Sequence, residues 1–455
     1  MILKEHIKSK KKILIGIFMA LILMGLLITN PVNINRGKSS TSINQNQTIK
    51  TSTITYVDDW AYGITDKNDY GWCIAIDSSN DLYIGGTTNE TGELDVIIIK
   101  VDSDGNHLWN VTWGSPGPDV VHGIALDSSG NIYITGSTFG YGSGIYDLFI
   151  AKFNSIGYKQ WNYTWGLGDP LSTSWGHSLI IDGNDIYIAG DADPGLGVSM
   201  DLALVKYNTA GTRLWNVTWG GSDSDYGWGI IKKDSTLYVV GRTDSYGAGN
   251  SDIALIKFSA SNGALLDNVT WGGTGDDSGG DLLIIDDSIY IAGSTVGLSG
   301  YTDGVLLKYD LSLNLKWAQT WGNVGNENIS STKIANCGSS LYVTGTNSLF
   351  DPTIDVHLAQ FNLSGSLLDR ESWDSGDADL VGDIVVDSTN NNTYIVATSG
   401  NGKSDITLIK WQIDCSPLPS EIIPAFGIEF LLFGLLITLA IVLTLRKKSK
   451  YLPIE

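Results

Sequence analysis

Acidic, aromatic and histidine side chains recur at equivalent positions along this chain, and their chemistry is suited to binding a ligand. Five aspartates, with Ser174 and Asn328 at the two remaining positions, each stand where an apolar segment begins, and two tryptophans and two histidines lie beside them. Carboxylates bind hard cations such as Ca²⁺, and ring faces stack on the apolar faces of sugars. The candidate binding residues are Asp69, Trp72, Asp119, His122, Ser174, His177, Asp225, Trp228, Asp277 and Asp379.

The same acids also have a structural interpretation, which the sequence leaves open. An aspartate at the start of a strand commonly accepts hydrogen bonds from nearby backbone N–H groups, as in Asx turns. Near-identical sites in successive repeats are typical of architecture, whereas a functional site usually breaks the symmetry. No residue is therefore assigned as a metal ligand, Ca²⁺ is retained as a candidate ligand, and no cofactor is expected.

Catalytic motifs are missing from the sequence. It contains no HExxH, no GxSxG, no Walker loop and no dinucleotide fingerprint. His122 and His177 fall in neighbouring repeats, so an extracellular hydrolase or lyase that uses one of them as a base beside an aspartate is an alternative to a binding protein. No catalytic residue is assigned.

A repeat of about 52 residues positions these side chains. Three markers each occur seven times: a tryptophan that ends a strand, an aspartate that opens an apolar strand, and the tyrosine of a strand typified by IYITG. The tryptophans are Trp60, Trp113, Trp165, Trp219, Trp271, Trp321 and Trp373. Each unit reads as four short strands, and such units recurring at this spacing predict a β-propeller of four-stranded antiparallel blades.

The phase of the repeat predicts how the ring closes. The last unit stops after Lys410 and Trp411 without an outer strand, while residues 54–60 stand before the first unit as an orphan copy of that strand. Pairing the orphan with the last blade would remove exposed sheet edges. We therefore expect an all-β, seven-bladed propeller over residues 53–413, closed by an N-terminal strand and followed by a C-terminal transmembrane helix.

The segments DSSGNIYITGST, DLFIAKFNSIG and WNYTWG resemble the SBBP family of bacterial and archaeal propeller repeats. The resemblance covers most of the chain between the two termini, and it implies a surface or secreted propeller without implying a reaction. The sixth and seventh repeats depart from the pattern, because Gln360 replaces a strand-ending lysine and Asp374 follows Trp373. Long, variable connections are expected on one face of the ring, and such loops on a rigid scaffold commonly bind ligands.

The termini and the charge indicate where the protein works. The net charge of −21 disfavours nucleic acid as a partner and is typical of a solvated acidic surface. Basic residues precede an apolar run at 13–29, and others follow a second apolar run near the C-terminus, which predicts an extracellular propeller between two cytoplasmic ends. The second run also resembles the C-terminal anchors of archaeal surface proteins. The expected segments are a signal peptide or signal anchor at 1–30, a polar linker at 31–52, the propeller, a Pro-rich hinge at 414–423, a transmembrane helix at 424–445 and a basic tail at 446–455.

Cysteines and glycosylation sequons add little to this scheme. Cys73 is expected to be a buried thiol, with a Cys73–Cys415 bridge between the first and last blades as the alternative. Asn89 and Asn391 are the glycosylation candidates.

The sequence as a whole favours a membrane-anchored surface protein that binds or scaffolds an extracellular protein, glycan or envelope component. A structural spacer in the surface layer is a further alternative.

Overall fold

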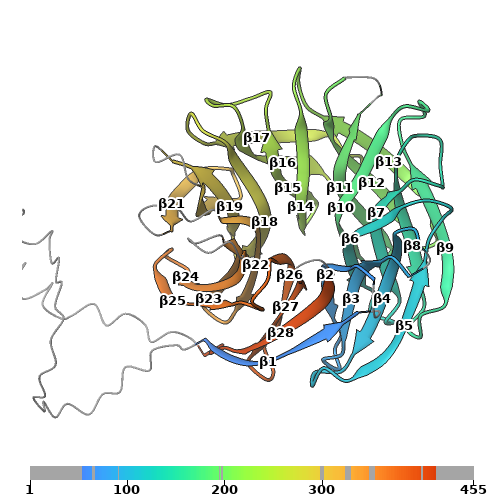
Figure 1. The fold of residues 1–455 in the computed structure, drawn as a ribbon. Coiled ribbons are helices and arrows are strands. Elements are labelled where there is room, and N and C mark those ends of the chain that lie inside the picture. Colours follow the sequence, from blue (N-terminus) through green and yellow to red (C-terminus); the bar gives the residue numbers. More distant parts are fainter. Residues whose placement is uncertain are drawn as a thin grey trace, which may run out of the picture. The chain divides into compact units, whose positions relative to one another are not determined.

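The described residues form seven four-stranded antiparallel sheets arranged as blades around a central axis (Figure 1). The structure is a computed structural model, and it describes residues 54–63, 67–90, 92–193, 195, 198–297, 302–322, 329–347, 354–400 and 403–416. The predicted seven-bladed, all-β propeller is therefore confirmed.

The inner strand of each blade lies next to the inner strands of the two neighbouring blades, and the contact between β2 and β26 completes the ring. The inner strands are β2 (Asp69–Ile76), β6 (Asp119–Leu126), β10 (Thr173–Asp182), β14 (Asp225–Lys233), β18 (Asp277–Ile285), β22 (Ile329–Cys337) and β26 (Asp379–Asp387). The second strands are β3 (Leu82–Thr88), β7 (Ile132–Thr138), β11 (Asp185–Asp193), β15 (Thr236–Thr243), β19 (Ser288–Val296), β23 (Ser340–Asn347) and β27 (Asn392–Ser399).

The third and fourth strands complete each blade outward from the axis. The third strands are β4 (Asp95–Val101), β8 (Asp147–Phe153), β12 (Asp201–Asn208), β16 (Asp252–Ser259), β20 (Thr302–Asp310), β24 (Asp355–Asn362) and β28 (Asp405–Gln412). The outer strands are β5 (His107–Trp113), β9 (Lys159–Trp165), β13 (Arg213–Trp219), β17 (Leu265–Trp271), β21 (Leu315–Trp321), β25 (Leu367–Trp373) and, for the last blade, β1 (Thr55–Tyr62).

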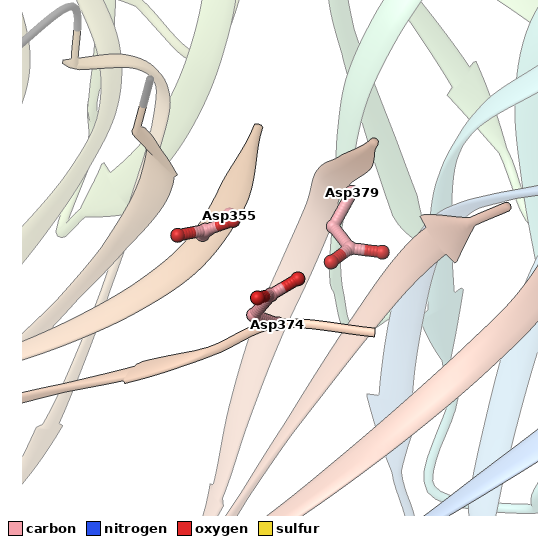
Figure 2. Close-up of side chains that lie close together, drawn as sticks. All are labelled: Asp355, Asp374 and Asp379. Carbon is pink, nitrogen blue, oxygen red and sulfur yellow. The ribbon is translucent and has the colours of Figure 1, made fainter. Parts of the chain in front are cut away.

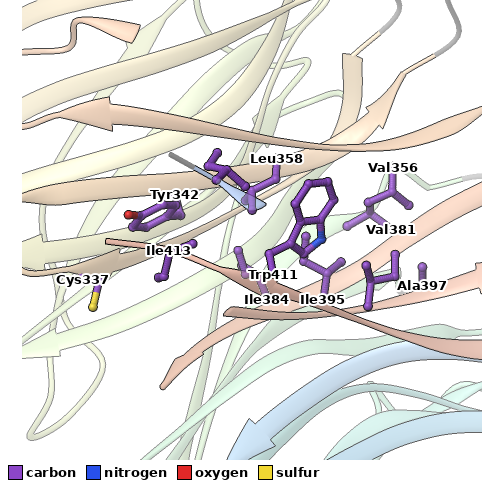
Figure 3. Close-up of a cluster of buried hydrophobic side chains, with 12 residues drawn as sticks. Cys337, Tyr342, Val356, Leu358, Val381, Ile384, Ile395, Ala397, Trp411 and Ile413 are labelled. Carbon is purple, nitrogen blue, oxygen red and sulfur yellow. The ribbon is translucent and has the colours of Figure 1, made fainter. Parts of the chain in front are cut away.

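Ring closure follows the sequence prediction. Strand β1 pairs antiparallel with β28, from Thr55 opposite Gln412 to Tyr62 opposite Ile406. Figure 3 shows the apolar cluster between the sixth and seventh blades, where Trp411 of β28 is buried among Val356, Leu358 and Ile395. The last blade is thus built from both ends of the propeller sequence and is packed like the others.

A tyrosine and a lysine connect most blades to the next one. Tyr187 and Lys206 both donate hydrogen bonds to the carbonyl of Ala260, at 3.3 and 3.2 Å, and the ammonium group lies 4.8 Å from the centre of the tyrosine ring. This Tyr–Lys clamp explains why the IYITG strand and the strand-ending lysine recur together. It is repeated by Tyr238 with Lys257, Tyr290 with Lys308 and Tyr394 with Lys410. In the sixth blade Gln360 takes the lysine position and donates to Ser340 instead.

The disulfide bond differs from the alternative considered for the sequence. Cys415, which follows β28, is bonded to Cys337 at the end of β22, and Cys73 is a buried free thiol. A Cys73–Cys415 bridge was therefore wrong, whereas burial of Cys73 is confirmed. The disulfide fastens the C-terminal end of the propeller to the sixth blade, on the face that carries the tight turns.

Several predicted segments fall outside the described residues. These are the signal segment at 1–30, the linker at 31–52, most of the hinge, the helix at 424–445 and the tail at 446–455. Within the part of the chain that the structure describes, no helix has the length and apolar character needed to cross a membrane.

Candidate ligand-binding cavity

A β-bulge in every inner strand directs one residue toward the axis of the propeller. Each inner strand loses register with its second strand near its fourth residue, as between Gly71 and Cys73 in the first blade. An extra residue that has no pairing partner bends the strand and re-aims a side chain. The seven bulged residues are Trp72, His122, His177, Trp228, Gly280, Thr332 and Gly382.

All seven bulged residues line one cavity of about 350 Å³ in the centre of the ring. The other lining residues are Trp175, Ser278, Ser294, Lys333 and Val381. Trp175, Ser278 and Ser294 come from the ends of their strands that meet the long connections, so the cavity occupies the loop-bearing half of the channel. A concave space of this size, with an apolar wall and a few polar groups, is typical of a small-ligand site.

The cavity is strongly asymmetric, because the bulged residues of the first four blades carry rings, whereas those of the last three are glycine or threonine. The centre of the His177 ring lies 4.5 Å from that of Trp228 and 5.4 Å from that of His122. The His122 ring lies in turn 5.6 Å from Trp72 and is stacked on Trp175 at 6.2 Å. These five rings form one continuous wall, which we call the aromatic wall.

The opposite side of the cavity, which we call the small-residue wall, consists of Ser278, Gly280, Ser294, Thr332, Val381 and Gly382. A Cβ atom on Gly280 would lie 2.3 Å from the carbonyl oxygen of Thr332, and one on Gly382 would lie 2.6 Å from that of Gly71. Both contacts are with backbone, so the neighbouring blades exclude any side chain at these two positions. The open half of the channel is therefore fixed by the packing of the blades.

The two histidines have different surroundings. Burial, with the neighbouring His177 and Lys333, lowers the pKa of His122 to about 3, so its imidazole is neutral at physiological pH. The Nε2 atom of His177 contacts the buried carboxylate of Asp191 on the adjacent strand β11. This His–Asp contact fixes the orientation of the ring and resembles the way carboxylates orient catalytic bases.

Three charged residues lie together at the level just beyond the bulges. Lys333 lines the cavity and interacts electrostatically with Asp281 and Asp383. Each acid also accepts a backbone N–H from the next blade, Asp281 from Ile334 and Asp383 from Ile74, both at 3.3 Å. Burial raises the pKa of Asp383 to about 6 and raises that of Asp281, while Lys333 opposes both shifts.

The strand-opening residues predicted from the sequence do not line the cavity. Asp69, Asp119, Ser174, Asp225, Asp277 and Asp379 are all buried. The carboxylate of Asp225 accepts the backbone N–H of Gly221 at 2.8 Å, and that of Asp277 accepts the N–H of Gly273 at 2.8 Å. In the same way, the carboxylates of Asp119 and Asp379 accept the backbone N–H groups of Ser115 and Ser375. These four carboxylates stabilise the connection that leads into each inner strand, as the structural interpretation expects.

One group of carboxylates has the geometry to share a cation. The carboxylate oxygens of Asp355, Asp374 and Asp379 lie within 4.8 Å of one another (Figure 2). In other blades a glycine stands where Asp374 does; a Cβ on Gly114 or Gly220 would lie about 2 Å from the aspartate that opens the third strand. The group therefore arises where the sixth repeat departs from the Trp-Gly pattern. Burial raises the pKa of Asp379 to about 6.

Sequence reasoning found the four aromatic bulged residues and missed the rest of the cavity. Asn328, which was aligned with the strand-opening acids, lies outside the described residues. The register places Ile329 at that position instead, because Ile329 pairs with Asn347 as Asp277 pairs with Thr295. With this shift of one residue, Lys333 takes the position that Asp281 and Asp383 hold in their own blades. An alignment that starts from Asn328 does not place these three charged residues at the same position.

The glycosylation candidates lie at strand ends. Asn89 follows β3 and is half-buried, and Asn391 precedes β27 in the left-handed region, with a φ of 56°. The backbone carbonyl of Asn391 accepts the N–H of Ile413 at 2.8 Å. Both positions are therefore part of connections that the backbone already constrains.

Comparisons with known proteins agree with the fold. Residues 113–142 match the model of the SBBP family, which is described as a beta-propeller repeat. The chain is thus a seven-bladed β-propeller, and one segment of it, residues 113–142, matches the SBBP repeat.

Two named proteins resemble parts of this chain. It is 26% identical over 271 residues to the regulatory protein FlaEY of Caulobacter vibrioides, a match that covers 48% of this chain and only 28% of that protein. A catalytically inactive virginiamycin B lyase from Staphylococcus aureus, solved with quinupristin, aligns with a TM-score of 0.46 at 12% identity, over 77% of this chain and 98% of the lyase.

Proposed function

We propose that this protein is a membrane-anchored cell-surface propeller that binds an extracellular ligand in its central cavity. The ligand classes that fit are a glycan, a protein or another envelope component that presents a small group to the channel. The observation that carries the proposal is the asymmetry of the bulged residues. A ring of identical repeats needs no difference between blades for its stability, whereas a binding site needs different groups on its different sides.

The disulfide bond supports the proposed location and orientation. Disulfides persist in oxidising compartments, which agrees with export of the propeller. Cys337 and Cys415 lie on the tight-turn face, and the described chain ends at Ser416 on that face. An anchor formed by residues 424–445 would therefore hold the tight-turn face toward the membrane and leave the cavity mouth facing outward.

Capture of envelope material tests this proposal. The purified full chain, held in detergent, is incubated with separated glycan and protein fractions of the cell envelope, and bound material is quantified. Ser278→Tyr should reduce capture at least tenfold, because Ser278 lines the cavity and the equivalent residue of the third blade, Trp175, shows that a ring at this position occupies it. Ser128→Tyr, in an exposed tight turn, is the matched control. Equal capture by all three proteins would contradict binding in the cavity, and no capture by any of them would contradict it and favour a structural spacer.

Recognition in this cavity needs no cofactor. Among the residues that the structure describes, those lining the cavity include no carboxylate, so added Ca²⁺ or a chelator is expected to leave capture unchanged. Any effect of Ca²⁺ on the melting temperature would instead point to Asp355, Asp374 and Asp379.

A hydrolase or lyase is the second candidate, and the His177–Asp191 contact is the observation that favours it. A base oriented by a buried carboxylate beside a cavity is a common catalytic arrangement. Joint replacement of His122 and His177 by alanine separates the two candidates. A lower yield of product per captured ligand would identify an enzyme, whereas an unmodified ligand in the wild-type protein identifies a binding protein.

A further inference from the structure

We infer that the central cavity selects a neutral saccharide residue. This inference rests on the proposed function, because it names the chemical class that the same cavity recognises. It depends on three properties of the cavity: one extended aromatic wall, an opposite wall of hydroxyl and backbone groups, and a charge that is compensated within the protein.

The aromatic wall is suited to the face of a sugar ring. Trp72, Trp175 and Trp228 belong to three different blades, and the two histidines fill the space between them. Aromatic faces carry partial negative charge, and the axial C–H groups of a pyranose carry partial positive charge, so the two surfaces attract when stacked. His122 is neutral at physiological pH and therefore adds ring surface without adding a charge.

The small-residue wall supplies polar partners for the hydroxyl groups of a sugar. Ser278, Ser294 and Thr332 carry hydroxyl groups, which both donate and accept hydrogen bonds. The Nε1 atom of Trp228 is buried and has no hydrogen-bond partner among the described residues. In the first blade the corresponding Nε1 of Trp72 donates to Thr87 at 3.0 Å, but Arg242 occupies the place of Thr87 beside Trp228 and pairs with Asp244. The indole N–H of Trp228 is thus unpaired among the described residues, and Trp228 contributes ring surface to the cavity.

The charges around the cavity disfavour strongly ionic ligands. The described residues that line the cavity include no carboxylate that could hold an organic cation against the aromatic wall. Asp281 and Asp383 interact electrostatically with Lys333 and compensate its charge, so an anion gains little from it. A ligand that is uncharged but rich in hydroxyls suits both conditions, since its oxygens can accept a hydrogen bond from Lys333 without bringing a charge into the cavity.

The volume limits the length of the saccharide. About 350 Å³ lies near the lower end of the range for small-molecule sites, so the cavity accommodates a terminal sugar and not an internal stretch of a long chain. The inferred ligand is therefore the exposed end of a neutral glycan.

Titration with simple glycosides tests the inference on the full chain in detergent. The probes are the methyl α- and β-glycosides of glucose, galactose, mannose and N-acetylglucosamine, with glucuronic acid and choline as charged comparisons. Tryptophan fluorescence and calorimetry should show saturable binding of at least one neutral glycoside, tighter than either charged compound. Trp228→Ala and Ser278→Tyr should each weaken this binding at least tenfold, and Ser128→Tyr should leave it unchanged.

The possible results separate this inference from the proposed function. If no neutral glycoside binds, or a charged compound binds more tightly, while Ser278→Tyr still abolishes envelope capture, the saccharide inference is overturned and the cavity remains the binding site. If a glycoside binds equally to wild type, Trp228→Ala and Ser278→Tyr, the sugar is held elsewhere and the inference is likewise overturned.

Discussion

The residue at the bulge of each inner strand decides what its blade contributes to the channel. Where it is Trp72 or Trp228 the channel is walled by a ring, and where it is Gly280 or Gly382 the backbone of the next blade comes too close for any side chain. One position further along, Lys333 interacts electrostatically with one acid from each of the two adjacent blades. Single residues within a common scaffold thus set the shape and charge of the cavity.

Replacing Asp383 by asparagine should change how stability depends on pH. The folded pKa of about 6 lies above the usual value of 3.8, so folding favours the protonated acid and the wild type loses stability as pH rises from about 4 to 6. Asparagine does not titrate and avoids this loss. The stability of Asp383→Asn relative to wild type, from urea unfolding, should therefore rise by about 2 kcal/mol between pH 4.5 and 7.5. A relative stability that is constant across this range would contradict the assigned environment.

The four-stranded blade is the element that the sequence predicted best, because its signals are local. Strand periodicity, the marker residues and the orphan strand at 54–60 are all visible in a single chain, and the structure confirms the blades and their closure. The cavity was predicted only in part, because bulges depend on how neighbouring blades pack. In the sixth blade the register differs by one residue from the repeat alignment, which concealed Lys333.

The Trp-Gly pattern of the outer strands also has a structural cause at this scale. The glycine allows the aspartate that opens the third strand to approach the end of the outer strand. In the fourth blade a Cβ on Gly272 would lie 2.2 Å from a carboxylate oxygen of Asp252 and 2.5 Å from one of Asp277, both of which are buried. A Cβ atom on the next residue, Gly273, would have no neighbouring atom within 4 Å.

This contrast gives a matched pair of substitutions. Gly272→Ala should lower the free energy of unfolding by about 2–3 kcal/mol, because two buried carboxylates must move away from their backbone donors. Gly273→Ala should change it by less than about 0.5 kcal/mol. Chemical denaturation followed by tryptophan fluorescence measures both. Similar values for the two variants would show that the buried aspartates do not depend on close approach to this glycine.

At the scale of the whole molecule, two connections hold the ring together. Strand β1 supplies the outer strand of the last blade, and the Cys337–Cys415 disulfide fastens the chain that leaves this blade to the sixth one. The disulfide joins residues 78 apart, and cross-links over long loops stabilise a fold mainly by restricting the unfolded chain. A force applied to the C-terminal segment therefore acts on the disulfide before it acts on the pairing of β1 with β28.

Cysteine mapping of the native full chain checks this arrangement. Digestion without reductant should yield a peptide that joins Cys337 to Cys415. Replacing both cysteines by serine should lower the free energy of unfolding by about 2–5 kcal/mol. Iodoacetamide should modify Cys73 only after denaturation, because the thiol is buried and burial raises its pKa. Recovery of a peptide linking Cys73 to either of the other cysteines would disprove the observed pairing.

The central claim is that the ligand enters the channel and contacts the aromatic wall. Amide hydrogen exchange of the full chain, measured with and without the captured envelope fraction, locates the contact directly. We predict added protection at the bulges of the first four blades, at residues 70–73, 120–123, 175–178 and 226–229. Protection confined to the tight-turn face or to the outer strands, with these four segments unchanged, would contradict the account.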